Sequence, residues 1–172
     1  MMLRKVALTL LVLAFSLPCL AGTNLKIGNP PPPFELPNLK NQVVSVDQFL
    51  GKEVTILSFF TSWSKSCQEE INFLKALWEQ EKGKKLNILG ISFDRKTNDL
   101  STFLAQNQIG FDILHDKKLV TLKDYRIIII PTLFVIDKNG KILNIYVDFD
   151  ENVKAAIQRD IHQLLSPTNK PS

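Results

Sequence analysis

The order in which apolar residues change from strand spacing to helix spacing limits this chain to few folds. Val54–Phe60 is a largely apolar run of the kind that forms a buried strand. A segment with helical spacing follows and is predicted to end at Gly83, and Leu86–Phe93 is a second run of the strand type. The apolar faces of the helices are marked by Ile71, Leu74, Leu77 and Trp78 in the first helix, and by Leu100, Phe103 and Leu104 in the second.

A hairpin and a last helix complete the pattern. Leu133–Ile136 and Ile142–Val147 flank Lys138-Asn139-Gly140, in which Asn-Gly is a strong hairpin signal. Asp112–Leu114 is predicted to be a short extended piece, and Val153–Leu165 has the spacing of an amphipathic helix. This order predicts an α/β domain of three layers, in which helices flank a central mixed β-sheet.

Composition agrees with one globular domain and excludes several other classes. Of the 172 residues, 45% are hydrophobic and 22% charged, which is enough to bury a core without disulfides. The net charge of +4 comes from 21 basic and 17 acidic residues spread along the chain, so we expect no nucleic-acid partner. Two cysteines and two histidines leave few ways to build a metal site, and we expect neither a metal nor a cofactor. We expect an extended proline-rich segment at 22–36, the folded domain at 37–165 and a flexible tail at 166–172.

The first residues have the layout of a secretory signal peptide. Arg4 and Lys5 precede the apolar run Val6–Leu20, and small residues follow around Ala21. The apolar run of about 15 residues is shorter than the ~20 residues that span a bilayer as a helix. We therefore predict a signal peptide at 1–21, export to the periplasm or secretion, and no membrane span after cleavage.

Membrane anchoring is the less favoured alternative, through an uncleaved signal or through a lipid on Cys19. Pro18 stands where bacterial lipoprotein signals usually carry a small residue, which argues against the lipid. Cleavage after Ala21 removes Cys19 and leaves Cys67 as the only thiol, so the exported chain cannot form an internal disulfide.

We expect the chemistry where the first long strand meets the following helix. Thr61–Cys67 joins the strand to the helix N-terminus, whose unpaired N–H groups stabilise an anion such as a thiolate. Ser64 suits the N-cap position, with its oxygen accepting an N–H from Ser66 or Cys67. The helix N-terminus and Lys65 are predicted to lower the pKa of Cys67, whereas nearby acids and burial raise it.

This stretch resembles the active site of the thioredoxin-fold redoxins, and most of all the exported TlpA/ResA-like thiol–disulfide oxidoreductases. The family pattern runs Phe-Trp-Ala-x-Trp-Cys-x-x-Cys-x-x-Glu and aligns with Phe59–Glu70. Trp63, Cys67 and Glu70 match the tryptophan, the second cysteine and the acid of that pattern. Downstream, Ile130–Asp137 resembles the strand that begins with the family's cis-proline.

The resemblance extends over almost the whole chain after the signal. Gly28–Leu36 resembles the family segment Gly-x-x-x-Pro-x-Phe-x-Leu, and Lys138–Lys141 resembles its hairpin, so that the match spans Ile27–Leu165. It implies a thioredoxin-like fold, protein or peptide thiols as partners, and a cis bond before Pro131. That bond would leave the backbone of Ile130 free to pair with an extended peptide.

One departure from the family pattern decides the chemistry. Ser64 stands where the family has its nucleophilic cysteine, and a serine hydroxyl neither ionises near neutral pH nor forms a disulfide. Because the dithiol cycle needs two sulfurs one helical turn apart, dithiol exchange is not expected. A serine hydrolase would need a base, and the sequence places neither His115 nor His162 near Ser64. We expect His115 at the surface or in a turn.

Three interpretations of the site stay open, and with them whether the chain is an enzyme. In the first, family thiol chemistry survives as mixed-disulfide formation by Cys67 alone. In the second, Cys67 is a buried and inert thiol, and a groove binds extended peptides without catalysis. The residues of that groove are Trp63, Ser64, Lys65, Ser66, Ile130 and Pro131. In the third, Ser64-x-x-Cys67 belongs to a one-cysteine peroxidase.

Three further positions allow two interpretations each. Glu70 either tunes the cysteine or is an exposed acid in the first helical turn. Trp63 either shapes the groove or covers the core. The run Ile127–Ile130 is either the start of a buried strand or, if exposed, an aggregation hazard.

Overall fold

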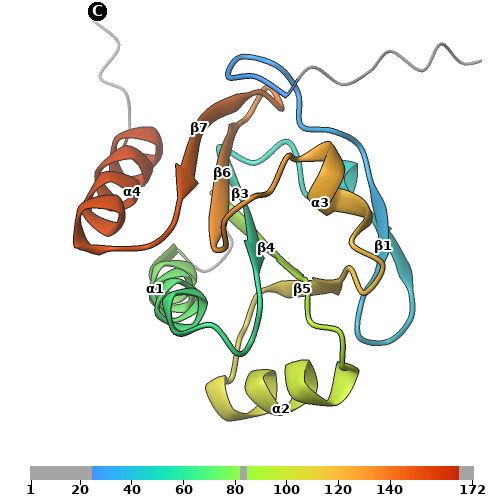
Figure 1. The fold of residues 1–172 in the computed structure, drawn as a ribbon. Coiled ribbons are helices and arrows are strands. Elements are labelled where there is room, and N and C mark those ends of the chain that lie inside the picture. Colours follow the sequence, from blue (N-terminus) through green and yellow to red (C-terminus); the bar gives the residue numbers. More distant parts are fainter. Residues whose placement is uncertain (1–24, 82–84, 167–172) are drawn as a thin grey trace, which may run out of the picture.

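The computed structural model describes residues 25–81 and 85–166, which form a sheet with both faces covered (Figure 1). The predicted signal peptide, the helix end predicted at Gly83 and all but the first residue of the predicted tail lie outside the described residues. Among the described residues, no helix is both long and apolar enough to cross a membrane.

The main sheet has five strands in the order β5-β4-β3-β6-β7. Their bounds are Val54–Phe60 for β3, Leu86–Ser92 for β4, Asp112–His115 for β5, Thr132–Asp137 for β6 and Ile142–Val147 for β7. β3, β4 and β5 run parallel, whereas β6 pairs antiparallel with both β3 and β7. The predicted mixed sheet is therefore confirmed.

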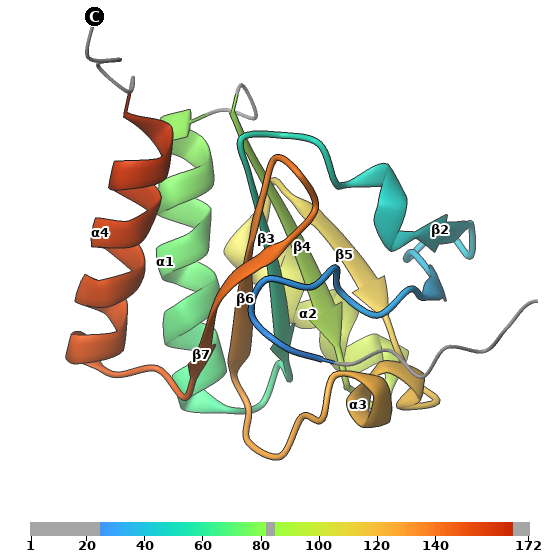
Figure 2. The same ribbon diagram turned by 90° about the horizontal axis from the view of Figure 1, so that it is seen from above.

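Helices cover the sheet on both sides, which gives the predicted three layers. Their bounds are Lys65–Glu81 for α1, Thr97–Asn107 for α2, Val120–Asp124 for α3 and Glu151–Leu165 for α4. Figure 2 shows α1 and α4 side by side on one face, and α2 packs into the same core. α3 and the chain before β3 cover the other face.

The central strand β3 shows why a largely apolar run suits this position. Ile56 and Phe60 pack into the core under α1, α2 and α4, whereas Leu57 and Phe59 pack into the core on the other face. Successive side chains of a strand point to opposite faces, so a strand covered on both sides must be apolar at nearly every position. Each such side chain contributes roughly 1.5–3 kcal/mol through burial.

The structure adds a small hairpin, a 3-10 helix at Val46–Gln48 and α3, none of which the sequence predicted. A small hairpin pairs β1, Glu35–Pro37, with β2, Val43–Ser45, and α3 follows β5. Strands of three residues and a helix of five are too short for periodicity to reveal. α3 is fixed instead by Asp116, whose carboxylate accepts the N–H groups of Val120 at 2.9 Å and Thr121 at 2.7 Å.

The isoleucine run Ile127–Ile130 is not the start of a buried strand. Ile127 is buried, but Ile128 is 93% exposed. β6 begins only at Thr132, after a cis peptide bond between Ile130 and Pro131. The chain must turn here from α3 back to the sheet, so its side chains do not follow the alternation of a strand.

Candidate functional site

Two loops meet at the edge of the sheet where β3 ends and β6 begins. The two strands are antiparallel with Phe59 opposite Thr132, so the residues that follow β3 lie near Pro131. Hydrogen bonds tie this edge to α1 through Asp148. Its N–H donates to the Pro131 carbonyl at 2.8 Å, and its carboxylate accepts the Ser66 hydroxyl at 2.9 Å.

Ser64 caps α1, as predicted. Its hydroxyl oxygen accepts the N–H of Cys67 at 3.5 Å, and its carbonyl accepts the N–H of Gln68 at 3.0 Å. The side-chain amide of Gln68 donates in return to the carbonyl of Ser62 at 2.7 Å. The cap therefore binds the N–H of Cys67 and not that of Ser66, whose hydroxyl donates to Asp148 after β7.

Cys67 is a free thiol with no exposed surface, in the first turn of α1. Burial is the largest influence and raises the pKa of the thiol above its usual value. The backbone and hydroxyl of Thr61 and the hydroxyl of Ser64 lower the pKa against that rise, and Glu70, when ionised, adds to it. The site thus buries the sulfur but keeps donors around it.

Glu70 is fully buried, which excludes its interpretation as an exposed acid of the first turn. The Ser58 hydroxyl donates to one carboxyl oxygen, and the other, Oε2, is buried without a hydrogen-bond partner. Burial raises the pKa of Glu70 to about 8, against a smaller lowering by Ser58. The carboxyl group is therefore mostly neutral at neutral pH, one helical turn beyond Cys67.

Contrary to the prediction from the sequence, Lys65 does not lower the pKa of Cys67. Its side chain is 90% exposed, and its ammonium group lies 3.7 Å from the carboxylate of Glu69. The groups that shift the pKa of Cys67 do not include Lys65. Water screens the charge of the exposed Lys65, and the exposed acid Glu69 beside it offsets that charge, so Lys65 has little effect on the thiol.

Sequence reasoning missed Asp94, the acid that fixes the loop between β3 and α1. Asp94 is 2% exposed and accepts the Ser62 N–H at 2.9 Å and the Ser62 hydroxyl at 2.8 Å. The Ser92 hydroxyl donates to it as well, at 2.7 Å. Its position just after the second parallel strand was the available signal, because such residues gather at one sheet edge.

His115 is buried at the end of β5, so its predicted place at the surface or in a turn is wrong. Its Nε2 lies 2.6 Å from the carbonyl oxygen of Asp94. A carbonyl only accepts hydrogen bonds, so this nitrogen carries the proton. Among the described residues, neither His115 nor His162 hydrogen-bonds to Ser64, and the serine has no histidine base.

Exposed apolar side chains surround the cis-proline edge. Trp63 is 73% exposed, which favours a role in a surface groove over covering the core. Ile128, Ile129, Thr132 and Val147 are among the residues that line a hollow of about 310 Å³, whose lining includes neither Trp63 nor Pro131. Large apolar side chains exposed on adjoining loops are typical of an interaction surface.

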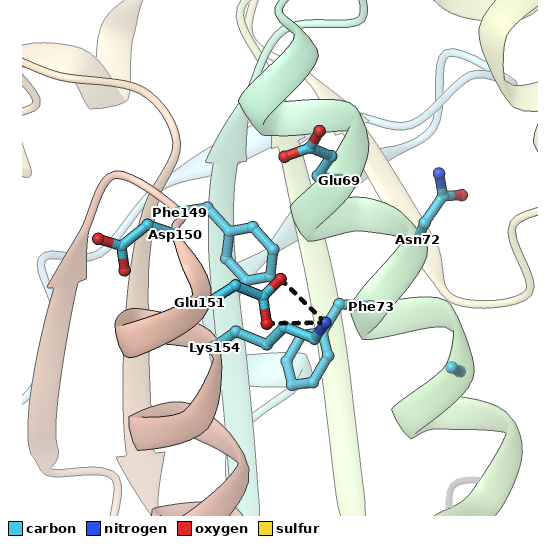
Figure 3. Close-up of a pocket in the computed structure, with 8 residues that line it drawn as sticks. Glu69, Asn72, Phe73, Phe149, Asp150, Glu151 and Lys154 are labelled. Atoms are coloured by element: carbon cyan, nitrogen blue, oxygen red, sulfur yellow. Dashed lines mark hydrogen bonds and ion pairs between the residues drawn. The ribbon is translucent and has the colours of Figure 1, made fainter.

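A second groove lies between α1 and α4 (Figure 3). Its volume is about 730 Å³, and the rings of Phe73 and Phe149 meet in it at a tilt of 41° with their centroids 5.6 Å apart. Its charged lining residues are Glu69, Asp150, Glu151 and Lys154, of which Lys154 and Glu151 form an ion pair at 3.4 Å. Across the described parts of the chain, no cluster of His, Cys, Asp and Glu could hold a metal ion.

Comparison with known proteins identifies the family. The AhpC/TSA family model matches residues 27–145. The chain belongs to the AhpC/TSA family. A thiol-disulfide oxidoreductase ResA from Bacillus thuringiensis subsp. konkukian (strain 97-27) is 30% identical to this redoxin over 119 residues, 69% of this chain and 68% of that protein. A protein of Buchnera aphidicola subsp. Schizaphis graminum (strain Sg) assigned as the peroxiredoxin bcp is 30% identical over 139 residues, 74% of this chain and 87% of that protein.

Solved structures agree with this placement of the redoxin. A Chlorobium tepidum protein assigned as the thiol:disulfide interchange protein DsbE superimposes with a TM-score of 0.76 at 32% identity. The match covers 83% of this chain and 99% of that structure. The thioredoxin-like fold and the redoxin family that the sequence predicted are therefore both confirmed.

Proposed function

We propose that this redoxin is a single-cysteine thiol protein that forms mixed disulfides with protein or peptide partners. The observation that carries the proposal is the place of Cys67 in the first turn of α1, with its N–H bonded to the Ser64 cap, because a helix N-terminus stabilises a thiolate. Thr61 and Ser64 both lower the pKa of the thiol, although burial leaves it raised. With a pKa of about 8, Glu70 is mostly uncharged at neutral pH and opposes the thiolate only weakly.

The proposed reaction is a thiol–disulfide exchange that replaces the partner's disulfide bond with one between the partner and Cys67. The thiolate of Cys67 attacks one sulfur of a partner disulfide, forms an S–S bond to it and releases the other sulfur as a thiolate. Ser64 cannot attack this mixed disulfide. A thiolate from solution must therefore take the partner's sulfur, and Cys67 leaves as the thiolate. The partner stays attached for longer than it would on a dithiol redoxin.

We propose that the partner lies as an extended peptide at the cis-proline edge. The backbone of Ile130 beside Pro131 would pair with it, and Trp63 would cover it. Lys65 and Ser66 begin the helix beside this edge. The exposure of Trp63, 73%, and of Ile128, 93%, supports an apolar contact with the partner.

A non-catalytic peptide-binding protein is the second candidate, and one observation favours it. The sulfur of Cys67 has no exposed surface, so a partner disulfide reaches it only if the loop that carries Trp63 and Ser64 moves. Binding at the cis-proline edge needs no such motion.

The rate of Cys67 alkylation as a function of pH in the folded protein separates the two candidates. Residues 1–21 are removed, or Cys19 is replaced by serine, so that Cys67 is the only thiol. Mass spectrometry then follows the adducts with oxidised glutathione and with hydrogen peroxide. Reaction of the folded protein with glutathione supports the proposal, and a thiol that reacts only on unfolding overturns it in favour of binding. Oxidation by peroxide alone would favour the peroxidase.

The variant Ser64→Cys tests how much of the family's chemistry the site retains. It restores two sulfurs one helical turn apart, so we expect an internal disulfide with Cys67 and the appearance of disulfide reductase activity. Ser66→Cys is the matched control, because its hydroxyl is directed to Asp148 and not to the sulfur. A folded but inactive Ser64→Cys protein would show that the site has lost more than one atom.

We also propose export, which rests on the signal-like residues 1–21. The mass of the protein recovered from a bacterial periplasm should correspond to a chain that begins at Gly22. Recovery of the uncut chain in the membrane fraction would support the anchored alternative.

A further inference from the structure

We propose that Thr61 is a positioning residue for Cys67, and that its hydroxyl donates to the sulfur when the sulfur is a thiolate. The proposal deepens the proposed function and rests on it for the use of the thiolate. It concerns a position at which the chain departs from the family motif, since that pattern has alanine where this chain has Thr61.

The first observation is a buried hydroxyl with nothing to bond to. Thr61 follows β3 and is 3% exposed, and its Oγ1 has no hydrogen-bond partner. A buried polar group without a partner typically costs about 1–3 kcal/mol, so it calls for a reason. Alanine in its place would leave no polar atom to satisfy.

The second observation is independent and concerns the sulfur. Both the backbone and the side chain of Thr61 stabilise the ionised form of Cys67. A neutral thiol is a weak acceptor, whereas a thiolate accepts strongly from a hydroxyl. The hydroxyl that lacks a partner in the resting protein therefore gains one when Cys67 ionises.

Few other groups near Cys67 can stabilise its thiolate. Ser64 is the other side chain that lowers the pKa of Cys67, and its oxygen already accepts the Cys67 N–H. Glu70 is the one charged group among the described residues that acts on the sulfur, and it opposes ionisation. Thr61 thus offsets part of the cost of burying a thiolate beside an acid.

The test compares Thr61→Val, which keeps the shape and removes the hydroxyl, with Thr61→Ser, which keeps the hydroxyl. Thiolate formation is followed by ultraviolet absorbance against a Cys67→Ala blank, alongside alkylation by iodoacetamide at several pH values. Thr55→Val is the matched control. Thr55 is buried like Thr61 but lies within β3, and its hydroxyl has a partner, because it donates to the Phe49 carbonyl at 2.8 Å.

We expect Thr61→Val to titrate at higher pH and to alkylate about three- to tenfold more slowly at a fixed pH below the midpoint. Its resistance to urea should be equal or greater, because a partnerless hydroxyl is removed. Thr61→Ser should keep the original profile, and Thr55→Val should lose stability but keep the profile too. If Thr61→Val does not fold, Thr61→Ala takes its place.

Two outcomes would overturn the proposal. One is a Thr61→Val titration that superimposes on that of the unaltered protein, and the other is a Thr61→Ser titration that shifts equally. If the proposed function fails instead, the result can be told apart from a failure of the Thr61 proposal. In that case the absorbance titration shifts with Thr61→Val, yet no variant forms a mixed disulfide with glutathione.

Discussion

Replacing Glu70 by glutamine should make the protein's stability much less dependent on pH. Glu70 is fully buried, and its pKa is raised from 4.5 to about 8. Between these values the unfolded chain ionises the group while the folded protein keeps its proton. The stabilisation is therefore complete below about pH 4.5, falls as the pH rises and is fully lost above about pH 8.

The size of the effect follows from the width of that window. Each unit of pH inside it lowers the free energy of unfolding by about 1.36 kcal/mol. Over the roughly 2.5 units from about pH 5 to about pH 7.5, the loss is about 3 kcal/mol. Glutamine does not titrate, so Glu70→Gln should escape this loss and be more stable than the original protein at neutral pH.

Urea unfolding at several pH values measures this directly. With a typical slope of about 1–3 kcal/mol per molar urea, the midpoints of the two proteins should separate by roughly 1–3 M as the pH rises across the window. Glu69→Gln is the control, since Glu69 is half exposed and paired with Lys65. Parallel pH profiles for Glu70→Gln and the original protein would refute the reasoning.

Two further predictions concern the loop between β3 and α1. Asp94→Ala leaves the Ser62 N–H and two serine hydroxyls without their buried acceptor, so the free energy of unfolding should fall by about 3 kcal/mol in urea titrations, whereas the exposed Asp112→Ala should change it little. An equal effect of the two changes would contradict the assigned role of Asp94. Trp63→Ala should alter stability by less than about 0.5 kcal/mol because its side chain is 73% exposed, but it should weaken capture of mixed-disulfide partners. Capture that survives unchanged would remove Trp63 from the proposed groove.

The long elements of this fold could be predicted from the sequence because their periodicity is local. β3 and β7 have the predicted bounds, and α1 and α4 follow from their apolar stripes. The turn at Ser64 was also predictable, since a helix cap depends only on its nearest neighbours in the chain. The three-residue strands and the short α3 were not predicted, because so few residues do not establish a period.

The state of the site depended on contacts between residues far apart in the chain. Asp94 holds Ser62 across 32 positions, and Glu70 is mostly neutral because the surrounding core buries it, against a smaller opposing effect of the Ser58 hydrogen bond. Burial and hydrogen bonding set a pKa, and neither is a property of a residue type or of its neighbours in sequence. The sequence by itself determined that one thiol stands at a helix N-terminus, with serine in place of its partner. Only the tertiary structure decided that this thiol is enclosed, that its neighbouring acid keeps a proton and that the hydroxyl of Thr61 is buried without a hydrogen-bond partner, because these properties arise where separate segments pack together.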